Sequence, residues 1–339
     1  MSGKSKIPGA LIGAVIGAII LPTAIIVVAL GQGHLRESVV LLSPSAPPTT
    51  TPTATITPTP TATPTVTATP TATAIPTATP TATPTPTPER PGGYWLSRPI
   101  GPQGEQHVDR FYPYGSTGGG RYRIHHGVEF QNEEGTPILA AASGRVIVAG
   151  RDDKVIYGAK PNFYGQLVIV ELEKRYRGEK LYNLYAHLSQ IDVEVGQMVE
   201  EGDMVGRVGM SGAAFGPHLH FEIRGGENTY DRTFNPELWL RPLPGCGIIV
   251  GRLIDAQGRP IPEALITVHH AESPEQRWQE VFTYPLEEVN PDEEWEENFV
   301  LGDVPEGTYV LKTRVKGKLC QKEVAVVAGE IVLAIMGIE

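Results

Sequence analysis

Proline and threonine dominate residues 43–91, in repeats such as TPTAT and TATPTP. Because proline fixes φ and lacks a backbone N–H, a proline every few residues blocks both helix and sheet. Almost no apolar side chain is available for burial, so we expect a disordered stalk with an extended, polyproline-like chain. At about 3.1 Å per residue, its reach is on the order of 100–150 Å. Folded structure is therefore confined to the segments on either side.

An uncharged apolar segment precedes the stalk. Residues 7–31 read IPGALIGAVIGAIILPTAIIVVALG, which is long enough to cross the hydrocarbon core of a bilayer. Lys4 and Lys6 lie just before it, which favours a cytoplasmic tail at residues 1–6 and an extracytoplasmic remainder. We therefore predict a single-pass signal anchor in the cell membrane. A cleaved signal peptide is the alternative, although no small-x-small cleavage site follows the segment.

The remaining chain is long enough for two domains. It belongs to a protein of 339 residues with 40% hydrophobic residues, so packed cores are possible. The formal net charge of −10 argues against a nucleic-acid partner, which would normally require a basic surface.

Short β-type runs broken by Gly, Asn and Pro fill residues 92–243. Examples are GRVIVAG (144–150), YGQLVIVELE (164–173) and EKLYNLYAHL (179–188). Such runs predict an all-β domain, and no stretch has a sustained helical period. The fold class that we predict is mainly β, with one compact antiparallel domain at 92–243 and a second β domain at 246–339.

Histidines gather at three places in the first β domain. In GPHLHFEIR (216–224), His218, His220 and Glu222 share one face of an expected strand, because residues two apart project to the same side. In YRIHHGVEF, His125 and Glu129 are four apart, so they would share a face if that segment were also a strand. His187 ends the aromatic-rich run LYAHLS.

Imidazole and carboxylate groups are common zinc ligands, and catalytic zinc sites keep three protein ligands and one open position. His125, Glu129 and one imidazole of the 218/220 pair would form such a set. The other imidazole and His187 would then accept and donate protons during the reaction. A half-exposed strand that merely carries polar histidines is the alternative.

These motifs together resemble the lysostaphin/LytM-type zinc endopeptidases, which act on bacterial cell-wall peptides. The resemblance covers residues 111–225, about a third of the chain, and the motifs occur in the order of the family. They are HHGVEF, GTPILAAASGRVIVAG, YGQLVIVE, YAHLS, GQMVEEGDMVGRVGMSG and GPHLHFEIR. The resemblance implies a compact antiparallel β structure with the site in an open groove.

The resemblance also implies a role for each residue. The family pattern His-x-Gly-x-Asp falls on His125, Gly127 and Glu129, so His125 and Glu129 are expected to be zinc ligands, and His126 is not. Pro-His-x-His places the third ligand at His220. His218 and His187 fall at positions that carry protons or stabilise the transition state.

Glu129 departs from the family pattern, which has aspartate there. The extra methylene displaces the carboxylate by about 1.5 Å, whereas metal sites tolerate only about 0.2 Å in ligand distance. The backbone or the rotamer must compensate. Glutamate is nevertheless a competent zinc ligand in other hydrolases.

The second β domain, at 246–339, resembles the carboxypeptidase-regulatory-like, transthyretin-type β-sandwich domains. The resemblance is carried by GRLIDAQGRPIPEALITV and by VPEGTY. It implies a binding or spacer role, with a wall polymer or a protein as possible partner. We expect His269 and His270 at the surface, the acidic run 287–298 as a solvated loop, and either a disulfide between Cys246 and Cys320 or two free thiols.

The function expected from the sequence is that of a membrane-anchored zinc metalloendopeptidase that cleaves the peptide cross-links of peptidoglycan. One alternative is a catalytically silent relative that binds wall peptides or activates another hydrolase. Another is a stalked adhesin, which would leave the histidines unexplained.

Overall fold

The computed structural model describes residues 95–117, 120–285 and 287–338. The expected cytoplasmic tail, membrane anchor and stalk (1–6, 7–31 and 43–91) lie outside these residues. Within the described ranges, no helix is long and apolar enough to span a bilayer.

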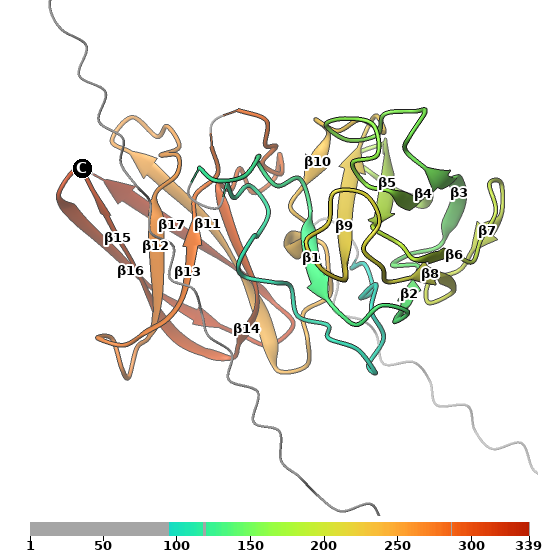
Figure 1. Cartoon of the computed structure of the whole chain (residues 1–339). Helices are drawn as coiled ribbons and strands as arrows, with labels where there is room; N and C mark the ends of the chain where they lie inside the picture. The colour runs from blue at the N-terminus through green and yellow to red at the C-terminus, as the bar shows by residue number, and fades with distance from the viewer. Residues whose placement is uncertain (1–94, 118–119, 286, 339) are drawn as a thin grey trace, which may run out of the picture. The chain divides into compact units, whose positions relative to one another are not determined.

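Antiparallel strands dominate the described residues, and their only helix is a 3-10 turn, Pro236–Leu238. This confirms the prediction of a mainly β fold (Figure 1). In the first half of the fold, one sheet has the strand order β1-β9-β5-β4-β3-β7, with β10 also paired to β9. A smaller sheet has the order β2-β8-β6. The strands of this half are β1 (Val128–Gln131), β2 (Pro137–Leu139), β3 (Gly144–Arg151), β4 (Gln166–Tyr176), β5 (Glu179–Ala186), β6 (Gln190–Ile191), β7 (Met198–Val199), β8 (Met204–Arg207), β9 (His218–Gly225) and β10 (Thr233–Phe234).

Strand β9 has the alternation that the sequence predicts. Leu219, Phe221 and Ile223 are fully buried in the main apolar cluster. The intervening side chains, His218, His220 and Glu222, are also buried, although they are polar. Because β1 and β5 flank β9 on either side, these polar groups are enclosed by neighbouring strands.

The second half of the fold contains two more sheets, with strand orders β14-β11-β17 and β13-β12-β15-β16. Side chains from both sheets form one buried apolar cluster, which includes Leu253, Val268 and Leu311. Ile248, Val250, Tyr284 and Val300 belong instead to the main cluster of the first half, so the two halves share buried surface. The strands are β11 (Cys246–Asp255), β12 (Leu265–His270), β13 (Arg277–Phe282), β14 (Phe299–Pro305), β15 (Gly307–Val315), β16 (Lys318–Val326) and β17 (Ile331–Ile338).

In the second half, the structure corrects the expectations for His269 and for part of the acidic run. His269 is buried and its Nε2 lies 2.9 Å from Thr267 Oγ1, so it is not a surface residue. Cys246 and Cys320 lie on different sheets as free thiols, which is the second of the two alternatives expected for them. The acidic run 287–298 is solvated only in part, because Asp292 and Glu297 are buried whereas its other five carboxylates are exposed.

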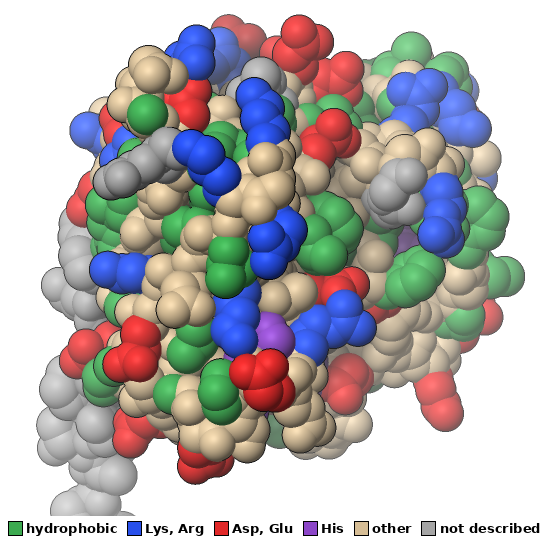
Figure 2. Space-filling model, turned by 90° about the vertical axis from the view of Figure 1, so that its left-hand side faces the viewer, with side chains coloured by type: hydrophobic (Ala, Val, Ile, Leu, Met, Phe, Trp, Pro, Cys, Tyr) green, Lys and Arg blue, Asp and Glu red, His purple; other side chains and the backbone are tan. Residues whose placement is uncertain are grey.

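Charged side chains of both signs share the face of the molecule shown in Figure 2, where Lys and Arg are interspersed with Asp and Glu. That face therefore lacks the single-sign field that would steer a polyanion toward it.

Candidate metal centre and active site

Strand pairing brings two of the expected ligands together. In the antiparallel ladder of β1 and β9, Glu129 lies directly opposite His220, and Gln131 lies opposite His218. Directly opposed residues project to the same face with their Cβ atoms about 4.5–5.5 Å apart. The register therefore places the carboxylate of Glu129 between the two imidazoles of β9.

His125 reaches the site by a different route from the one expected. β1 begins at Val128, so His125 lies outside the strand, and strand parity with Glu129 does not explain their convergence. Its backbone pairs instead with a preceding loop: His125 N donates to Ser116 O (3.0 Å), and Gly115 N donates to His125 O (2.8 Å). The loop thus fixes the backbone from which the imidazole projects.

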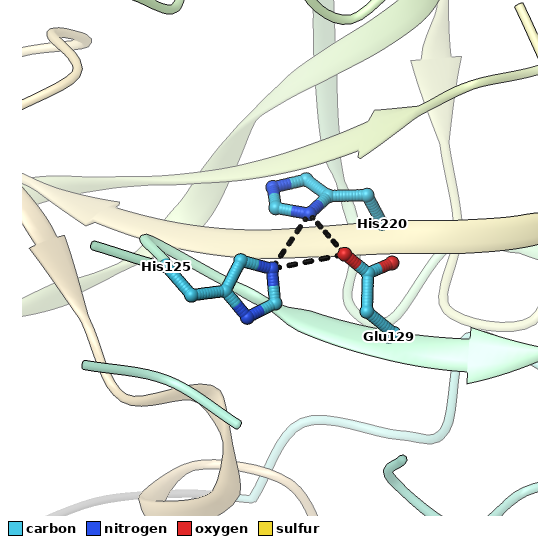
Figure 3. Close-up of side chains that lie close together, drawn as sticks. All are labelled: His125, Glu129 and His220. Atoms are coloured by element: carbon cyan, nitrogen blue, oxygen red, sulfur yellow. Dashed lines mark hydrogen bonds and ion pairs between the residues drawn. The ribbon is translucent and has the colours of Figure 1, made fainter. Parts of the chain in front are cut away.

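One donor atom each from His125, Glu129 and His220 forms a triangle, which we call the ligand triangle; all three atoms lie within 4.8 Å of one another (Figure 3). His125 Nε2 lies 2.9 Å from Glu129 Oε1. His220 Nδ1 lies 3.2 Å from the same carboxylate oxygen and 3.2 Å from His125 Nε2. All three residues are buried. The glutamate therefore reaches both imidazoles despite its additional methylene.

This triangle suits zinc. Ligand bonds of about 2.0–2.1 Å in tetrahedral geometry put the donor atoms roughly 3.3 Å apart, close to the separations above. Two imidazoles and one carboxylate are a donor set that zinc takes in catalytic sites, with one position left open. The residues present therefore fit a catalytic zinc ion.

Gly127 makes room for His220. A Cβ atom added at Gly127 would lie 2.6 Å from Phe221 O and 2.8 Å from His220 Nε2. Any side chain at this position would clash with the backbone oxygen of Phe221 and with the imidazole of His220. The glycine of HHGVEF is therefore required by the close approach of the segment to β9.

Glu222 orients His220, a role that was not predicted from the sequence. Its Oε1 accepts a hydrogen bond from His220 Nε2 (2.9 Å), which leaves Nδ1 facing the ligand triangle. Its Oε2 lies 2.7 Å from both Nε and the NH2 nitrogen of Arg224, and Tyr164 OH also donates to Glu222. Both charged side chains are fully buried. The sequence signal that could have identified Glu222 is its position as the third polar residue, after His218 and His220, on the same face of β9.

The cluster favours positive charge at the triangle. Burial alone would raise the pKa of Glu129, but the charge of His220 and hydrogen bonds from the neighbouring imidazoles hold it well below its usual range. Burial would likewise lower the pKa of His220, but Glu129 and Glu222 raise it to about 9. The carboxylates thus stabilise a cation between them.

His187 directly follows β5, at the residue where the chain turns with φ 64°. Its Nδ1 donates to Ser211 O (2.8 Å), so the remaining nitrogen, Nε2, is the proton acceptor. Burial, together with the nearby charge of His220, lowers the pKa of His187 to about 3, so the ring is neutral near pH 7. Its ring lies 4.9 Å from that of His218 and 5.7 Å from that of His220, between ring centroids.

His218 contacts the far oxygen of the ligand carboxylate. Its Nδ1 donates to Gly216 O (2.9 Å), and its Nε2 lies 2.8 Å from Glu129 Oε2. Burial opposes the charged ring, but the hydrogen bond and the charge of Glu129 raise the pKa of His218. His218 thus lies beside the triangle, in contact with its carboxylate. The ring of His126 packs against that of Tyr230, and its Nδ1 lies 3.0 Å from Thr233 Oγ1, so His126 is not one of the three residues of the triangle.

The triangle lies in a groove of about 500 Å³. Two exposed aromatic side chains lie on its rim, Phe215 (94% exposed) and Phe111 (72% exposed). Arg123 and Lys160 add positive charge to the lining. Aromatic and positively charged side chains thus surround the triangle in this groove. The other aromatic lining residues are Tyr112, Tyr122, Phe163 and Tyr230.

The site coincides with a match to a known family. Residues 123–232 match Peptidase family M23. The matched segment contains all five residues proposed from the sequence, His125, Glu129, His187, His218 and His220. This supports an M23 peptidase domain of the LytM/lysostaphin type in this chain.

Curated relatives match the same region. Lysostaphin of Staphylococcus staphylolyticus is 36% identical over 111 residues, which are 33% of this chain and 20% of the relative. A glycyl-glycine endopeptidase of Staphylococcus capitis is 34% identical over 111 residues, which are 33% of this chain and 26% of the relative. The chain thus spans about a fifth to a quarter of the length of these proteins.

Solved structures show the same partial likeness. The catalytic domain of lysostaphin from Staphylococcus simulans aligns at a TM-score of 0.30 and 30% identity, covering 37% of this chain and 82% of that domain. A zinc containing peptidase from Vibrio cholerae aligns at a TM-score of 0.30 and 25% identity, covering 40% of each chain.

Proposed function

We propose that this protein is a zinc-dependent endopeptidase that cleaves peptide cross-links in bacterial peptidoglycan. The observation that carries the proposal is the meeting of His125 Nε2, Glu129 Oε1 and His220 Nδ1 in an open groove. The M23 match, the lysostaphin relatives and the glycyl-glycine endopeptidase relative support the same reaction class.

Each residue has a distinct task in this proposal. His125, Glu129 and His220 would hold a zinc ion, which would supply Lewis-acid chemistry toward a peptide carbonyl and toward a water molecule. The neutral His187, with Nδ1 held by Ser211 O, accepts a proton from that water at Nε2. His218 donates a hydrogen bond to the negative charge that develops on the carbonyl oxygen, or a proton to the leaving amine.

We also propose the arrangement of the whole chain from its sequence. The apolar segment 7–31 anchors the protein in the cell membrane, and the stalk 43–91 holds the catalytic domain (92–243) outside the cytoplasm. Residues 246–339 form the transthyretin-type β-sandwich domain, with a wall polymer or a second protein as possible partner.

The test is digestion of purified peptidoglycan by the full chain, with released peptides and new amino termini measured by mass spectrometry. We expect release by wild type, no release after zinc chelation, and restoration when zinc is returned. His107→Ala is the matched control, because His107 is an exposed histidine outside the groove lining, and it should digest like wild type. Peptidoglycan binding by a zinc-loaded protein that releases no peptide would instead support the catalytically silent relative.

A further inference from the structure

The two histidines of the triangle are held in different ways. A metal-binding histidine usually donates its second ring N–H to an acceptor, which fixes the ring. His220 does so through Glu222, whereas Nδ1 of His125 is buried and has no hydrogen-bond partner. Something other than a hydrogen bond must therefore orient the ring of His125.

Tyr112 is the side chain that orients the imidazole of His125. Its ring stacks on the imidazole of His125, with centroids 4.2 Å apart and planes 10° apart. Tyr112 belongs to the loop 109–116, which also pairs with the backbone of His125 at Gly115 and Ser116. The Tyr112 hydroxyl donates to Arg123 O, two residues before His125. The loop thus controls both the ring and the backbone of this ligand.

Residues 246–339, the second half of the fold, contact the loop at both of its ends. At its start, Arg110 donates to Gly302 O in β14 (2.6 Å) and pairs with Glu237. At its end, a Cβ added to Gly115 would lie only 2.7 Å from Cδ1 of Tyr284. The ring of Tyr284 also meets that of Tyr114 edge-on, with centroids 5.5 Å apart.

Tyr284 is itself held firmly. It is 5% exposed, and its hydroxyl accepts a hydrogen bond from Asn235 Nδ2 (2.9 Å). Glu297 accepts from the same hydroxyl at 3.4 Å. Earlier in the acidic run, Asn290 Nδ2 donates to Thr233 O (3.0 Å). The same oxygen accepts a hydrogen bond from Tyr114 OH of the loop (2.8 Å).

We propose that the second half of the fold, residues 246–339, positions the metal ligand His125, with Tyr284 as the positioning residue that acts through Gly115 and Tyr114 on the loop 109–116. This half is then a part of the catalytic centre and not only a spacer or a wall-binding module. The inference rests on the proposed zinc function, but the contact between Tyr284 and the loop does not depend on zinc.

The experiment uses the full chain and three variants. Tyr284→Ala removes the ring, Tyr284→Phe keeps the ring and loses only the hydroxyl, and Val281→Ala is the control. Val281 is buried in the other apolar cluster of the same half, so its truncation loosens that half without touching the loop. Zinc affinity is measured by chelator competition, and hydrogen exchange of the Gly115 and His125 amides is measured without zinc.

We expect Tyr284→Ala to weaken zinc binding by about 10–100-fold, the range seen when groups that orient a metal ligand are removed. Exchange of the two amides should rise in parallel. Tyr284→Phe and Val281→Ala should both keep the zinc affinity and the amide exchange of the wild type. If Tyr284→Ala does not fold, Asn290→Ala should shift both readouts in the same direction by a smaller amount.

Two results would overturn the inference: wild-type zinc affinity and exchange in Tyr284→Ala, or equal changes in Val281→Ala. If wild type binds no zinc at all, the proposed function fails, and exchange of the two amides alone decides the inference.

Discussion

Glu222→Gln is the substitution whose effects the structure specifies most closely. Three donors converge on the buried carboxylate, namely His220 Nε2, the guanidinium of Arg224 and Tyr164 OH. Burial raises the pKa of Glu222, but Arg224 and His220 lower it to about 2, so it is ionised at neutral pH. Glutamine has one acceptor oxygen, and its NH2 group would face a donor.

The magnitude follows from these contacts. Removing one partner of a buried ion pair costs about 3–5 kcal/mol, because the other charge is left uncompensated. At about 2–4 °C per kcal/mol for a fold of this size, Tm should fall by about 6–20 °C. Loss of the group that orients a metal-binding histidine costs about 10–100-fold in metal affinity, or about 1.4–2.8 kcal/mol.

The assay pairs thermal unfolding of the metal-free protein with chelator competition for zinc. Leu172→Ala is the matched control, since this leucine is 1% exposed and lies on β4, two strands away from β9. It should lower stability by about 2–5 kcal/mol and leave zinc affinity unchanged. If Glu222→Gln lowers Tm but binds zinc like wild type, Glu222 stabilises the fold without orienting His220, and our reasoning is refuted.

Three further substitutions test other parts of the structure. Asn183→Leu should stabilise the protein by about 1–2 kcal/mol in urea unfolding, because both amide atoms are buried without a hydrogen-bond partner; lower stability would contradict this. Burial raises the pKa of Glu297 from 4.5 to about 8, so the folded state holds a proton that the unfolded state releases, and the unfolding free energy should fall as pH rises from 4.5 through 8. Glu297→Gln should remove up to about 5 kcal/mol of this fall, and an equal pH dependence in both proteins would count against the buried carboxyl. His187→Ala should reduce peptide release by about 10²–10⁴-fold with zinc affinity retained, and loss of zinc would show that His187 binds the metal instead.

The sequence predicted the elements of this fold better than their pairings. The alternation of GPHLHFEIR follows from a period of two, and β9 has it. The register that sets Glu129 opposite His220 joins residues 91 positions apart, so no local pattern specifies it. For His125, strand parity gave the wrong route to the site, because tertiary pairing with the loop 109–116 places it there.

The groups that orient the ligands were the hardest to find. Glu222 and Arg224 were visible as charged residues on a strand, but only the structure shows that both are fully buried and paired. The acidic run was expected to be solvated because it is charged. Most of its carboxylates are exposed, but Asp292 N donates to Glu297 Oε2 (2.8 Å), and these two side chains are buried.

The central claim is that His125, Glu129 and His220 bind one zinc ion. Anomalous diffraction at the zinc edge, from crystals of the zinc-loaded protein, tests it most directly. We expect one peak within about 2.0–2.2 Å of His125 Nε2, Glu129 Oε1 and His220 Nδ1. A peak bound elsewhere, or none at this triangle when zinc is in excess, would contradict it.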